Sequence, residues 1–408
     1  MTGFYDSLET RSDEERASEL ARDLPAQIAN AKTNAQGYSE ALQNIDPDSI
    51  TRISDLEALP VLRKSNLSEA QKANAPFGGY SAIAPKDIRH VFQSPGPIYE
   101  MGQKGHDWWR FGRFLHALGV GANDVVQNTF SYHFTPAGMM FENAAEAVGA
   151  TVFPAGPGQT ELQARAAADL GVTCYAGTPD YLNTILQKGD ALGLDLSRIR
   201  VAAVSGGPLF PQIRQAYADR GIVCLQCYAT ADLGHIAYET PAMDGLIVDE
   251  GVIVEIVTPG TGKPVAAGEV GEVVVTSLNR DYPLIRFATG DLSAILPGIS
   301  PCGRTNMRIV GWKGRADQAT KVKGMFVRPE QVAALLDRHP EVYKARVEVN
   351  HDGQNDTLLV RLETDSKECA GYENSIRELL KLRAKVVLCH KGELPRDGLV
   401  IADQRAAN

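Results

Sequence analysis

The chain has 408 residues, of which 44% are hydrophobic and 22% charged, and its formal net charge is −9 at pH 7. This length favours one large domain with a smaller one, and no apolar run reaches the roughly 20 residues that a membrane-spanning helix needs. The negative charge argues against nucleic acids and anionic membranes as partners, because both attract basic surfaces.

The first 45 residues predict helices. Leu8, Leu20, Leu24 and Ile28 recur at helical spacing among charged residues. Residues 1–16 are acidic and polar and lack the apolar core of a secretory signal. We therefore expect packing helices here and a cytoplasmic location, in which the six cysteines stay reduced.

From residue 88 to residue 275, short β-rich runs alternate with amphipathic segments, which predicts parallel β-α units. The expected strands lie at 125–128, 151–154, 201–204 and 222–227, and the expected helices at 138–148 and 160–170. The last two strands end in small-residue turns, and ligands of open α/β sheets collect at such carboxyl ends. After residue 251, turns rich in Pro and Gly predict an antiparallel section.

An aromatic run follows the strand expected at 125–128. It contains His133, the one side chain there that titrates near neutral pH and a candidate acid or base. A single histidine beside aromatic residues is more often a packing residue, and the same two interpretations apply to His235.

Cys224 and Cys227 have the C-x-x-C spacing of redox and zinc sites. They fall inside a strand-like run without a second Cys or His pair at zinc-finger spacing, which favours buried structural thiols.

Residues 286–292 read Arg-Phe-Ala-Thr-Gly-Asp-Leu and end a polar loop in Asp291. An ionised carboxylate has two acceptor oxygens, so it can take both vicinal hydroxyls of a ribose. Gly-Arg-Ala-Asp at 314–317 and Lys-Val-Lys-Gly at 321–324 follow it and suggest a hinge.

Beyond Gly314 we expect helices at 329–337 and 372–382, strands at 345–349 and 357–362, and a last strand at 385–388. The predicted fold class is therefore α/β. A large N-terminal domain (1–314) combines parallel β-α units with an antiparallel section, and a small mobile α+β domain (315–408) follows.

Six segments, in this order and over nearly the whole chain, resemble the phenylacetate-CoA ligase family of the adenylate-forming, or acyl-CoA synthetase, superfamily. They are Leu-Pro-Val-Leu-Arg-Lys at 59–64, Gly-Ala-Thr-Val-Phe-Pro at 149–154, Gly-Gln-Thr-Glu at 158–161, Thr-Pro-Asp-Tyr at 178–181, Ser-Gly-Gly-Pro at 205–208 and Tyr-Ala-Thr-Ala-Asp at 228–232. The resemblance implies an enzyme that activates a carboxylic acid with ATP to an acyl-adenylate. Its small domain then rotates, and the sulfur of CoA attacks the adenylate.

The resemblance also implies the residues of the binding sites. Nucleotide-binding roles fall to Ser205, Gly206, Gly207, Pro208, Tyr228, Asp291 and Arg315. The acyl pocket, for an aromatic or short acid, falls to Phe130, Tyr132 and Phe134, with the turn at 205–208 as its opposite wall. CoA-binding roles fall to Lys323, Gly324 and Arg328, for which a solvated basic hairpin is the alternative.

Catalytic roles follow in the same way for Thr230, Asp232 and His133. Asp232 stands where the family has a metal-binding glutamate, so Mg²⁺ is the expected metal. Thr230 would donate to the acid or to a phosphate. The alternative is that Asp232 caps a buried strand end.

Two devices of the family are missing. The phosphate loop would fall at 92–102, where two prolines remove N–H donors and Glu100 adds a negative charge; a rigid surface turn is the alternative. The catalytic lysine that normally follows a Leu-Pro-Arg turn is absent after Lys391. Some relatives also bind zinc, but only Cys302 matches their ligands, with Thr240 and Met243 at the other positions, so we expect no zinc.

Three functions remain open. The first is an acid–CoA ligase that uses ATP, CoA and a small-molecule carboxylic acid. The second is an enzyme without ATP cleavage that acts on a CoA thioester or another activated acid. The third is a non-catalytic sensor of nucleotide or acyl-CoA. Homodimers are common among the family's members, so a homodimer is an expected assembly.

Overall fold

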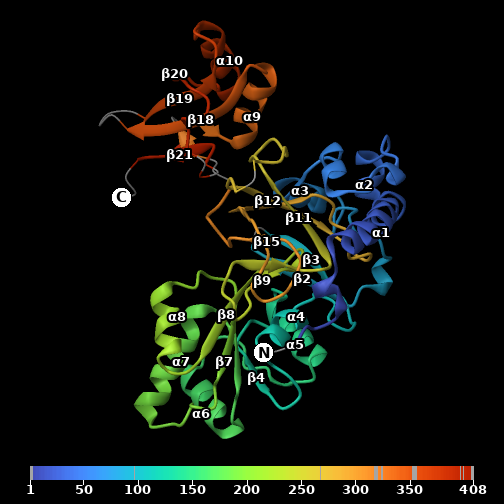
Figure 1. The fold of residues 1–408 in the computed structure, drawn as a ribbon, viewed down its shortest axis with the longest axis vertical. Coiled ribbons are helices and arrows are strands. Elements are labelled where there is room, and N and C mark those ends of the chain that lie inside the picture. The colour runs from blue at the N-terminus through green and yellow to red at the C-terminus, as the bar shows by residue number, and fades with distance from the viewer. Residues whose placement is uncertain are drawn as a thin grey trace. The chain divides into compact units, whose positions relative to one another are not determined.

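The structure, a computed structural model, describes residues 3–95, 97–266, 268–316, 320–322, 325–351, 356–395, 397 and 399–405. It contains two compact units (Figure 1). The first comprises Met1–Val254, Val275–Phe287 and Leu296–Gly311, and the second comprises Glu255–Val274, Ala288–Ile295 and Trp312–Asn408. The domain boundary expected after Gly314 stays a prediction.

A nine-stranded sheet forms the centre of the first unit among the described residues, in the order β14-β15-β10-β9-β8-β7-β6-β4-β5. Five neighbouring strands are parallel: β4 (Val125–Asn128), β5 (Thr151–Phe153), β6 (Cys174–Gly177), β7 (Val201–Val204) and β8 (Val223–Thr230). The others are β9 (Gly234–Tyr238), β10 (Leu246–Val248), β14 (Ile295–Leu296) and β15 (Arg308–Ile309). β9 pairs antiparallel with β8, and β10 pairs antiparallel with β9 and β15. The α/β class with parallel and antiparallel strands is therefore confirmed, although the antiparallel pairing begins before residue 251.

Helices cover both faces of the parallel strands, as Figure 1 shows. In β7, Val201 and Ala203 belong to the hydrophobic cluster that contains residues of α4 (Gly112–Ala117) and α5 (Ala137–Ala147). Ala202 and Val204 belong instead to the cluster of the opposite face. The helices of that face are α6 (Thr160–Leu170), α7 (Pro179–Leu192) and α8 (Pro211–Ala218). Alternate residues of a strand point to opposite faces, which explains why this strand is apolar throughout.

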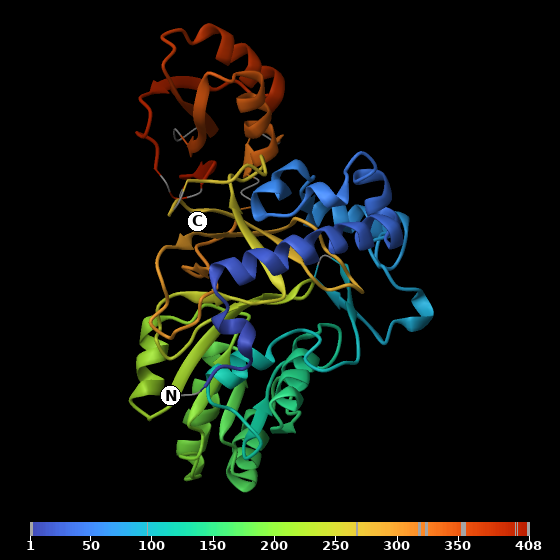
Figure 2. The same cartoon turned by 45° about the vertical axis from the view of Figure 1, so that its right-hand side comes forward.

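The expected N-terminal helices are α1 (Asp13–Asn34) and α2 (Gln36–Ala41). Ser12 and Glu15 form a capping box at the start of α1. Leu24 and Ile28 are fully buried, and the Gln27 amide donates to the carbonyl oxygens of Ser277 and Asn279. These contacts hold α1, the long blue helix of Figure 2, against the rest of the first unit.

A second sheet has the order β1-β13-β12-β11. Its strands are β1 (Leu62–Arg63), β11 (Val252–Val257), β12 (Gly271–Ser277) and β13 (Phe287–Ser293), and α3 (Lys64–Ala73) follows β1 directly. The last three strands each carry the chain from one unit into the other. Short 3-10 helices span Ser7–Thr10, Pro47–Ser49, Ile53–Ala58 and Pro85–Asp87.

Residues 92–102 form a β-hairpin of β2 (His90–Ser94) and β3 (Ile98–Gly102). Its register pairs Ser94 with Ile98 and Phe92 with Glu100. Phe92, Ile98 and Met101 are buried. Neither interpretation of residues 92–102, as a phosphate loop or as a rigid surface turn, describes the whole segment, because most of it forms a packed pair of strands.

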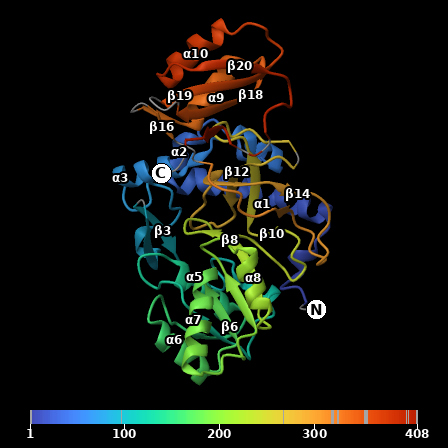
Figure 3. The same cartoon turned by 90° about the vertical axis from the view of Figure 1, so that its left-hand side faces the viewer.

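The C-terminal part of the second unit is the expected α+β fold (Figure 3). Its elements are β16 (Thr320–Val322), β17 (Met325–Val327), α9 (Pro329–Arg338), β18 (Val342–His351), β19 (Asp356–Thr364), α10 (Ala370–Leu380), β20 (Lys385–Cys389) and β21 (Ile401–Asp403). Side chains of α9, α10, β18 and β19 share one hydrophobic cluster. The expectation that β20 is the last strand is wrong, because β21 pairs in parallel with β18. Within the described ranges, no helix has the length and apolar character that crossing a bilayer requires.

Candidate functional site

Thr230 is the last residue of β8, and Asp232 lies in the turn between β8 and β9, at the carboxyl end of this central strand of the large sheet. The Asp232 side chain is 1% exposed, and its Oδ2 accepts a hydrogen bond from the Lys64 ammonium at 3.0 Å. Its Oδ1 is buried and has no hydrogen-bond partner among the described residues. Thr230 Oγ1 accepts from the Leu233 N–H at 3.2 Å. If Asp232 only capped the end of the strand, its carboxylate would accept a hydrogen bond from a backbone N–H. Its observed donor is instead the side chain of Lys64.

The contact of Lys64 with Asp232 was not predicted from the sequence. Lys64 is the first residue of α3, a helix whose first turn carries no acidic residue and whose N-cap makes no side-chain hydrogen bond to the helix. Helix N-termini favour negative side chains, so a lysine there is unusual. The lysine at the start of a helix without an acidic first turn was the feature of the sequence that could have drawn attention to Lys64.

Glu100 of β3 is fully buried beside this pair. Ser94 donates its N–H to Glu100 Oε2 at 3.1 Å and its hydroxyl to Oε1. Burial and the negative charge of Asp232 raise the pKa of Glu100 to about 7, against the opposing effects of Ser94 and Lys64. The Glu100 carboxyl, which the sequence suggested as a negative charge, is therefore partly protonated near neutral pH.

The donor set at Asp232 suits a magnesium ion that arrives with its own phosphate ligands. No group of three or more His, Cys, Asp or Glu side chains gathers for a metal in the part of the chain that the structure describes. Mg²⁺ is commonly held by one or two carboxylates together with water and substrate phosphates. The Oδ1 atom of Asp232, buried and without a donor, is suited to be that one protein ligand.

The residues expected for the acyl pocket follow β4. Phe130 is 9% exposed and stacks on Phe141 with ring centroids 4.8 Å apart. The Tyr132 hydroxyl accepts from the Asn128 amide at 2.8 Å. His133 is exposed, with its Nδ1 3.2 Å from Ser131 Oγ, and Phe134 is 69% exposed. Phe130 is thus part of the core, whereas His133 and Phe134 lie on the surface of the first unit.

The turn after β7 reaches the same region. Ser205 is buried and donates its hydroxyl to the Cys227 carbonyl at 3.2 Å, while Gly206, Gly207 and Pro208 are exposed. A methyl group at Gly206 would lie 3.7 Å from Phe130, so the structure brings this turn and Phe130 together. Tyr228, in β8, is half-buried.

Cys224, Cys227 and His235 have the surroundings of structural residues. Burial raises the pKa of both thiols to about 12, so neither is a ready thiolate. His235 is fully buried, with its Nδ1 3.4 Å from Asp249 Oδ2. These positions favour the structural interpretation of the C-x-x-C pair and the packing interpretation of His235.

In the second unit, Asp291 lies in β13, and its backbone forms an isolated antiparallel β-bridge with that of Arg315. Its Oδ1 accepts from Trp312 Nε1 at 3.0 Å and from Arg315 NH1 at 3.1 Å. The Asp291 side chain is 13% exposed, and those of Arg315 and Trp312 lie largely at the surface. A carboxylate fixed by an indole and a guanidinium is prepositioned, which suits it to hydrogen-bond a ligand. Trp312 had no role in the sequence-based prediction.

Gly290 keeps space for the Arg315 guanidinium. Its φ is +75°, and a methyl group there would come within 2.6 Å of Arg315 NH2. We expect Gly290→Ala to lower the free energy of unfolding by about 1–2 kcal/mol through the left-handed backbone alone, and by more because Arg315 must move. Urea unfolding measures this loss.

Gly268→Ala is the matched control for that substitution. Gly268 has a φ of +76° in the same unit, and nothing lies within 4 Å of its added methyl group. Equal losses for the two variants would contradict the steric role of Gly290.

The remaining predicted residues are in the C-terminal part. Arg328 is the exposed N-cap residue of α9, where its N–H donates to Gln331 Oε1 at 2.9 Å. Lys323, Gly324 and the hinge residue Asp317 lie outside the described residues.

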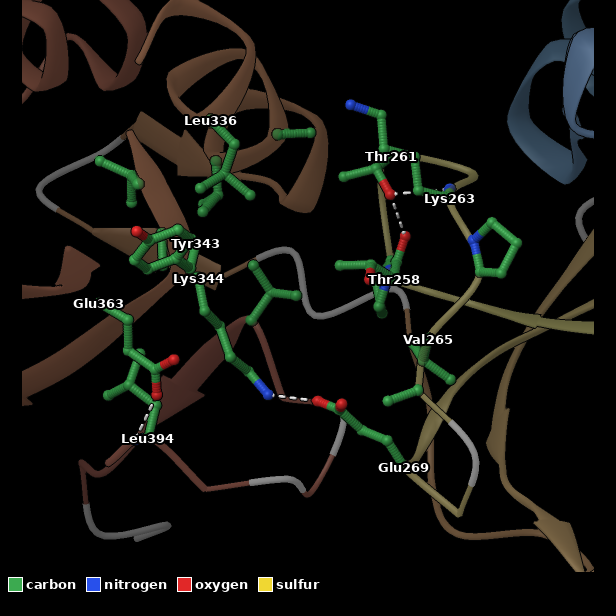
Figure 4. A pocket seen from close by; sticks show the side chains of 18 of the residues that line it. Thr258, Thr261, Lys263, Val265, Glu269, Leu336, Tyr343, Lys344, Glu363 and Leu394 are labelled. Atoms are coloured by element: carbon green, nitrogen blue, oxygen red, sulfur yellow. Dashed lines mark hydrogen bonds and ion pairs between the residues drawn. The ribbon is translucent and has the colours of Figure 1, made fainter. Parts of the chain in front are cut away.

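A pocket of about 580 Å³ lies within the second unit (Figure 4). Lys344 pairs with Glu269 across it, and the Lys391 ammonium lies 4.6 Å from the centre of the Tyr343 ring. None of the predicted site residues that the structure describes lines this pocket. It therefore adds no support to the predicted assignments.

Comparison with known proteins shows what the chain is similar to. The family model for AMP-binding enzymes matches residues 106–279. The chain is 28% identical to a phenylacetate-coenzyme A ligase of Aromatoleum evansii over 94% of this chain and 92% of that protein. It is also 28% identical to the enzyme of that name from Escherichia coli K12, over 96% and 94% of the two chains.

Solved structures share the fold. A 2-hydroxyisobutyryl-CoA ligase in an open conformation, in complex with 2-HIB-AMP and CoA, matches with a TM-score of 0.72 at 22% identity, over 95% of this chain and 91% of that one. The same ligase in its postadenylation state matches with a TM-score of 0.71 at 23% identity, over 98% and 91%. The likeness to these solved structures shows the fold of the chain, and the chain is similar in sequence to phenylacetate-coenzyme A ligases over most of its length.

Proposed function

We propose that this protein is an acid–CoA ligase. It activates a carboxylic acid with ATP as an acyl-adenylate and then transfers the acyl group to the sulfur of CoA. The relatives named phenylacetate-coenzyme A ligase, and the related structure that contains an acyl-adenylate and CoA, support this reaction. The observation that carries the proposal is the Asp291 carboxylate, fixed by Trp312 and Arg315.

In this proposal Asp291 accepts hydrogen bonds from the ribose hydroxyls of ATP. Tyr228 lies against the adenine, and the turn at 205–208 contributes to the nucleotide site. Arg315 is assigned to the nucleotide because its guanidinium already contacts the ribose-binding carboxylate. A guanidinium suits an anionic ligand, since its donors form a planar fork.

The acid is assigned to the region of Tyr132, the exposed Phe134 and the buried Phe130, whose aromatic rings suit an aromatic or short acid. The proximity of Gly206 to Phe130 supports a common site for acid and nucleotide. Thr230 donates to the carboxylate or the α-phosphate, and His133 is the candidate acid or base. Asp232 would hold a Mg²⁺ ion, which would neutralise phosphate charge there.

The CoA phosphates and pantetheine are assigned to Lys323, Gly324 and Arg328. The small domain, residues 315–408, turns about the hinge at 314–317 between the two half-reactions. A homodimer is the proposed assembly.

Exchange of labelled pyrophosphate into ATP tests the first half-reaction. With a panel of aryl and short-chain acids, we expect exchange that depends on the acid and is retained without CoA. Turnover of acyl-CoA without ATP would instead favour the enzyme that has lost ATP cleavage, for which the hairpin at 92–102 is the supporting observation. Tight acyl-CoA binding without any turnover would favour the sensor.

A further inference from the structure

The hairpin β2–β3 offers few donors to a phosphate. Ser94 uses both its N–H and its hydroxyl on Glu100. Pro95 and Pro97 of the connecting turn have no N–H groups. A triphosphate therefore needs another source of positive charge in the first unit.

The N-terminus of α3 is such a source. Its first residue is Lys64 and its N-cap is Arg63, and its first turn contains no acidic residue. The first N–H groups of a helix lack partners within the helix and carry a partial positive charge, so they bind anions well. A lysine at this end adds a full charge of the same sign.

The ion pair with Asp232 fixes the ammonium of Lys64. The carboxylate is 1% exposed and the lysine side chain 35% exposed, so the anchor is buried while the cation reaches solvent. Asp232 is the one hydrogen-bond partner of this ammonium among the described residues. An ammonium has three donors, so two remain for a ligand.

Independent evidence for a ligand comes from Asp232 Oδ1. This oxygen is buried without a hydrogen-bond donor in the described part of the chain. Leaving a charged buried oxygen unsatisfied is costly, and a cation that accompanies the ligand would satisfy it. The pair thus presents a donor for phosphate oxygens and an acceptor for the metal that phosphate carries.

We propose that the phosphates of ATP bind at the N-terminus of α3, where Lys64 supplies the positive charge that the hairpin and the absent C-terminal lysine do not. This inference rests on the proposed function and extends it. An oxygen of the acid attacks the α-phosphorus, and the bond from this phosphorus to the oxygen bridging to the β-phosphate breaks. Pyrophosphate leaves with the electron pair of that bond. Lys64 stays protonated and stabilises the departing charge.

The test compares Lys64→Gln and Lys64→Arg with wild type. Glutamine lacks the charge but can still donate to Asp232, which protects the fold; arginine keeps the charge. Lys72→Gln, an exposed lysine in the last turn of the same helix, is the matched control. Three quantities are measured: pyrophosphate exchange into ATP, calorimetric affinity for inorganic pyrophosphate with Mg²⁺, and thioester formation from a pre-made acyl-adenylate and CoA.

We expect Lys64→Gln to lower exchange by roughly 100-fold, the usual effect of removing one preorganised donor to a developing anion. Its affinity for pyrophosphate should fall at least about tenfold, as expected when a charge-assisted contact is lost. Thioester formation should stay within about threefold of wild type, because no phosphoanhydride is cleaved in that step. Lys64→Arg should recover part of the exchange, and Lys72→Gln should match wild type.

Equal pyrophosphate affinities of wild type and Lys64→Gln would overturn the inference. If wild type shows no exchange with any acid, the proposed function fails. A pyrophosphate affinity that is present in wild type and lost in Lys64→Gln would still support the phosphate site in that case. Loss of thioester formation together with exchange would overturn the specific role of Lys64 in the first half-reaction.

Discussion

Replacing Asp291 by alanine should lower kcat/KM for ATP by about 100- to 10,000-fold in the exchange reaction. A hydrogen bond to a charged acceptor contributes about 1.5–3 kcal/mol, and this carboxylate is proposed to accept two from the ribose. Asp291→Asn should lose less, because its amide keeps one acceptor oxygen. Steady-state kinetics with varied ATP at saturating acid measure the effect.

Deoxynucleotides provide the sharper control for this prediction. If Asp291 holds the ribose hydroxyls, wild type should discriminate strongly against 2′-deoxy-ATP and 3′-deoxy-ATP, whereas Asp291→Ala should not. The losses from the mutation and from the missing hydroxyl should therefore not add. Asp190→Asn, which removes an exposed carboxylate paired with Arg220, should leave the kinetics unchanged. Fully additive losses would show that Asp291 acts elsewhere.

Much of the first unit could be predicted from the sequence because its signals are local. β7 is a short apolar run, β4 and β8 are short runs that begin with apolar residues, and small-residue turns follow β7 and β8. α6 occupies the predicted range of 160–170. Such runs between turn residues carry the pattern of parallel β-α units without knowledge of their neighbours. The short strand β21 lacked such a signal, since three residues cannot show a period.

The charged cluster of the candidate site could not be predicted in this way. Lys64 and Asp232 are 168 residues apart in the sequence, and their contact depends on how α3 meets the end of β8. The sequence indicated that Glu100 places a negative charge in residues 92–102, where a phosphate loop would fall. Its burial and its bonds from Ser94, which decide its charge, arise only when the hairpin forms.

Wild type should lose stability relative to Glu100→Gln as the pH rises from about 4.5 to about 7. The folded pKa of Glu100 is raised to about 7, chiefly by burial and then by Asp232, from an ordinary value of 4.5. Within this window the unfolded chain releases the proton while the folded chain keeps it. The free energy of unfolding therefore falls with pH, by up to about 3 kcal/mol in total, and changes no further above pH 7.

Glutamine is a close mimic of the protonated acid here, since its amide oxygen can accept the Ser94 N–H and its amide nitrogen can donate to the Ser94 hydroxyl. The charged or titratable groups that face Glu100 are Lys64, Asp232 and Tyr282, and all three stay in the variant. Urea unfolding of both proteins at pH 5, 6, 7 and 8 should give a stability difference that grows up to pH 7 and then levels off. Glu161→Gln, a half-exposed carboxylate, should show no such trend. A constant difference between wild type and Glu100→Gln would mean that Glu100 is already ionised in the folded protein at pH 5.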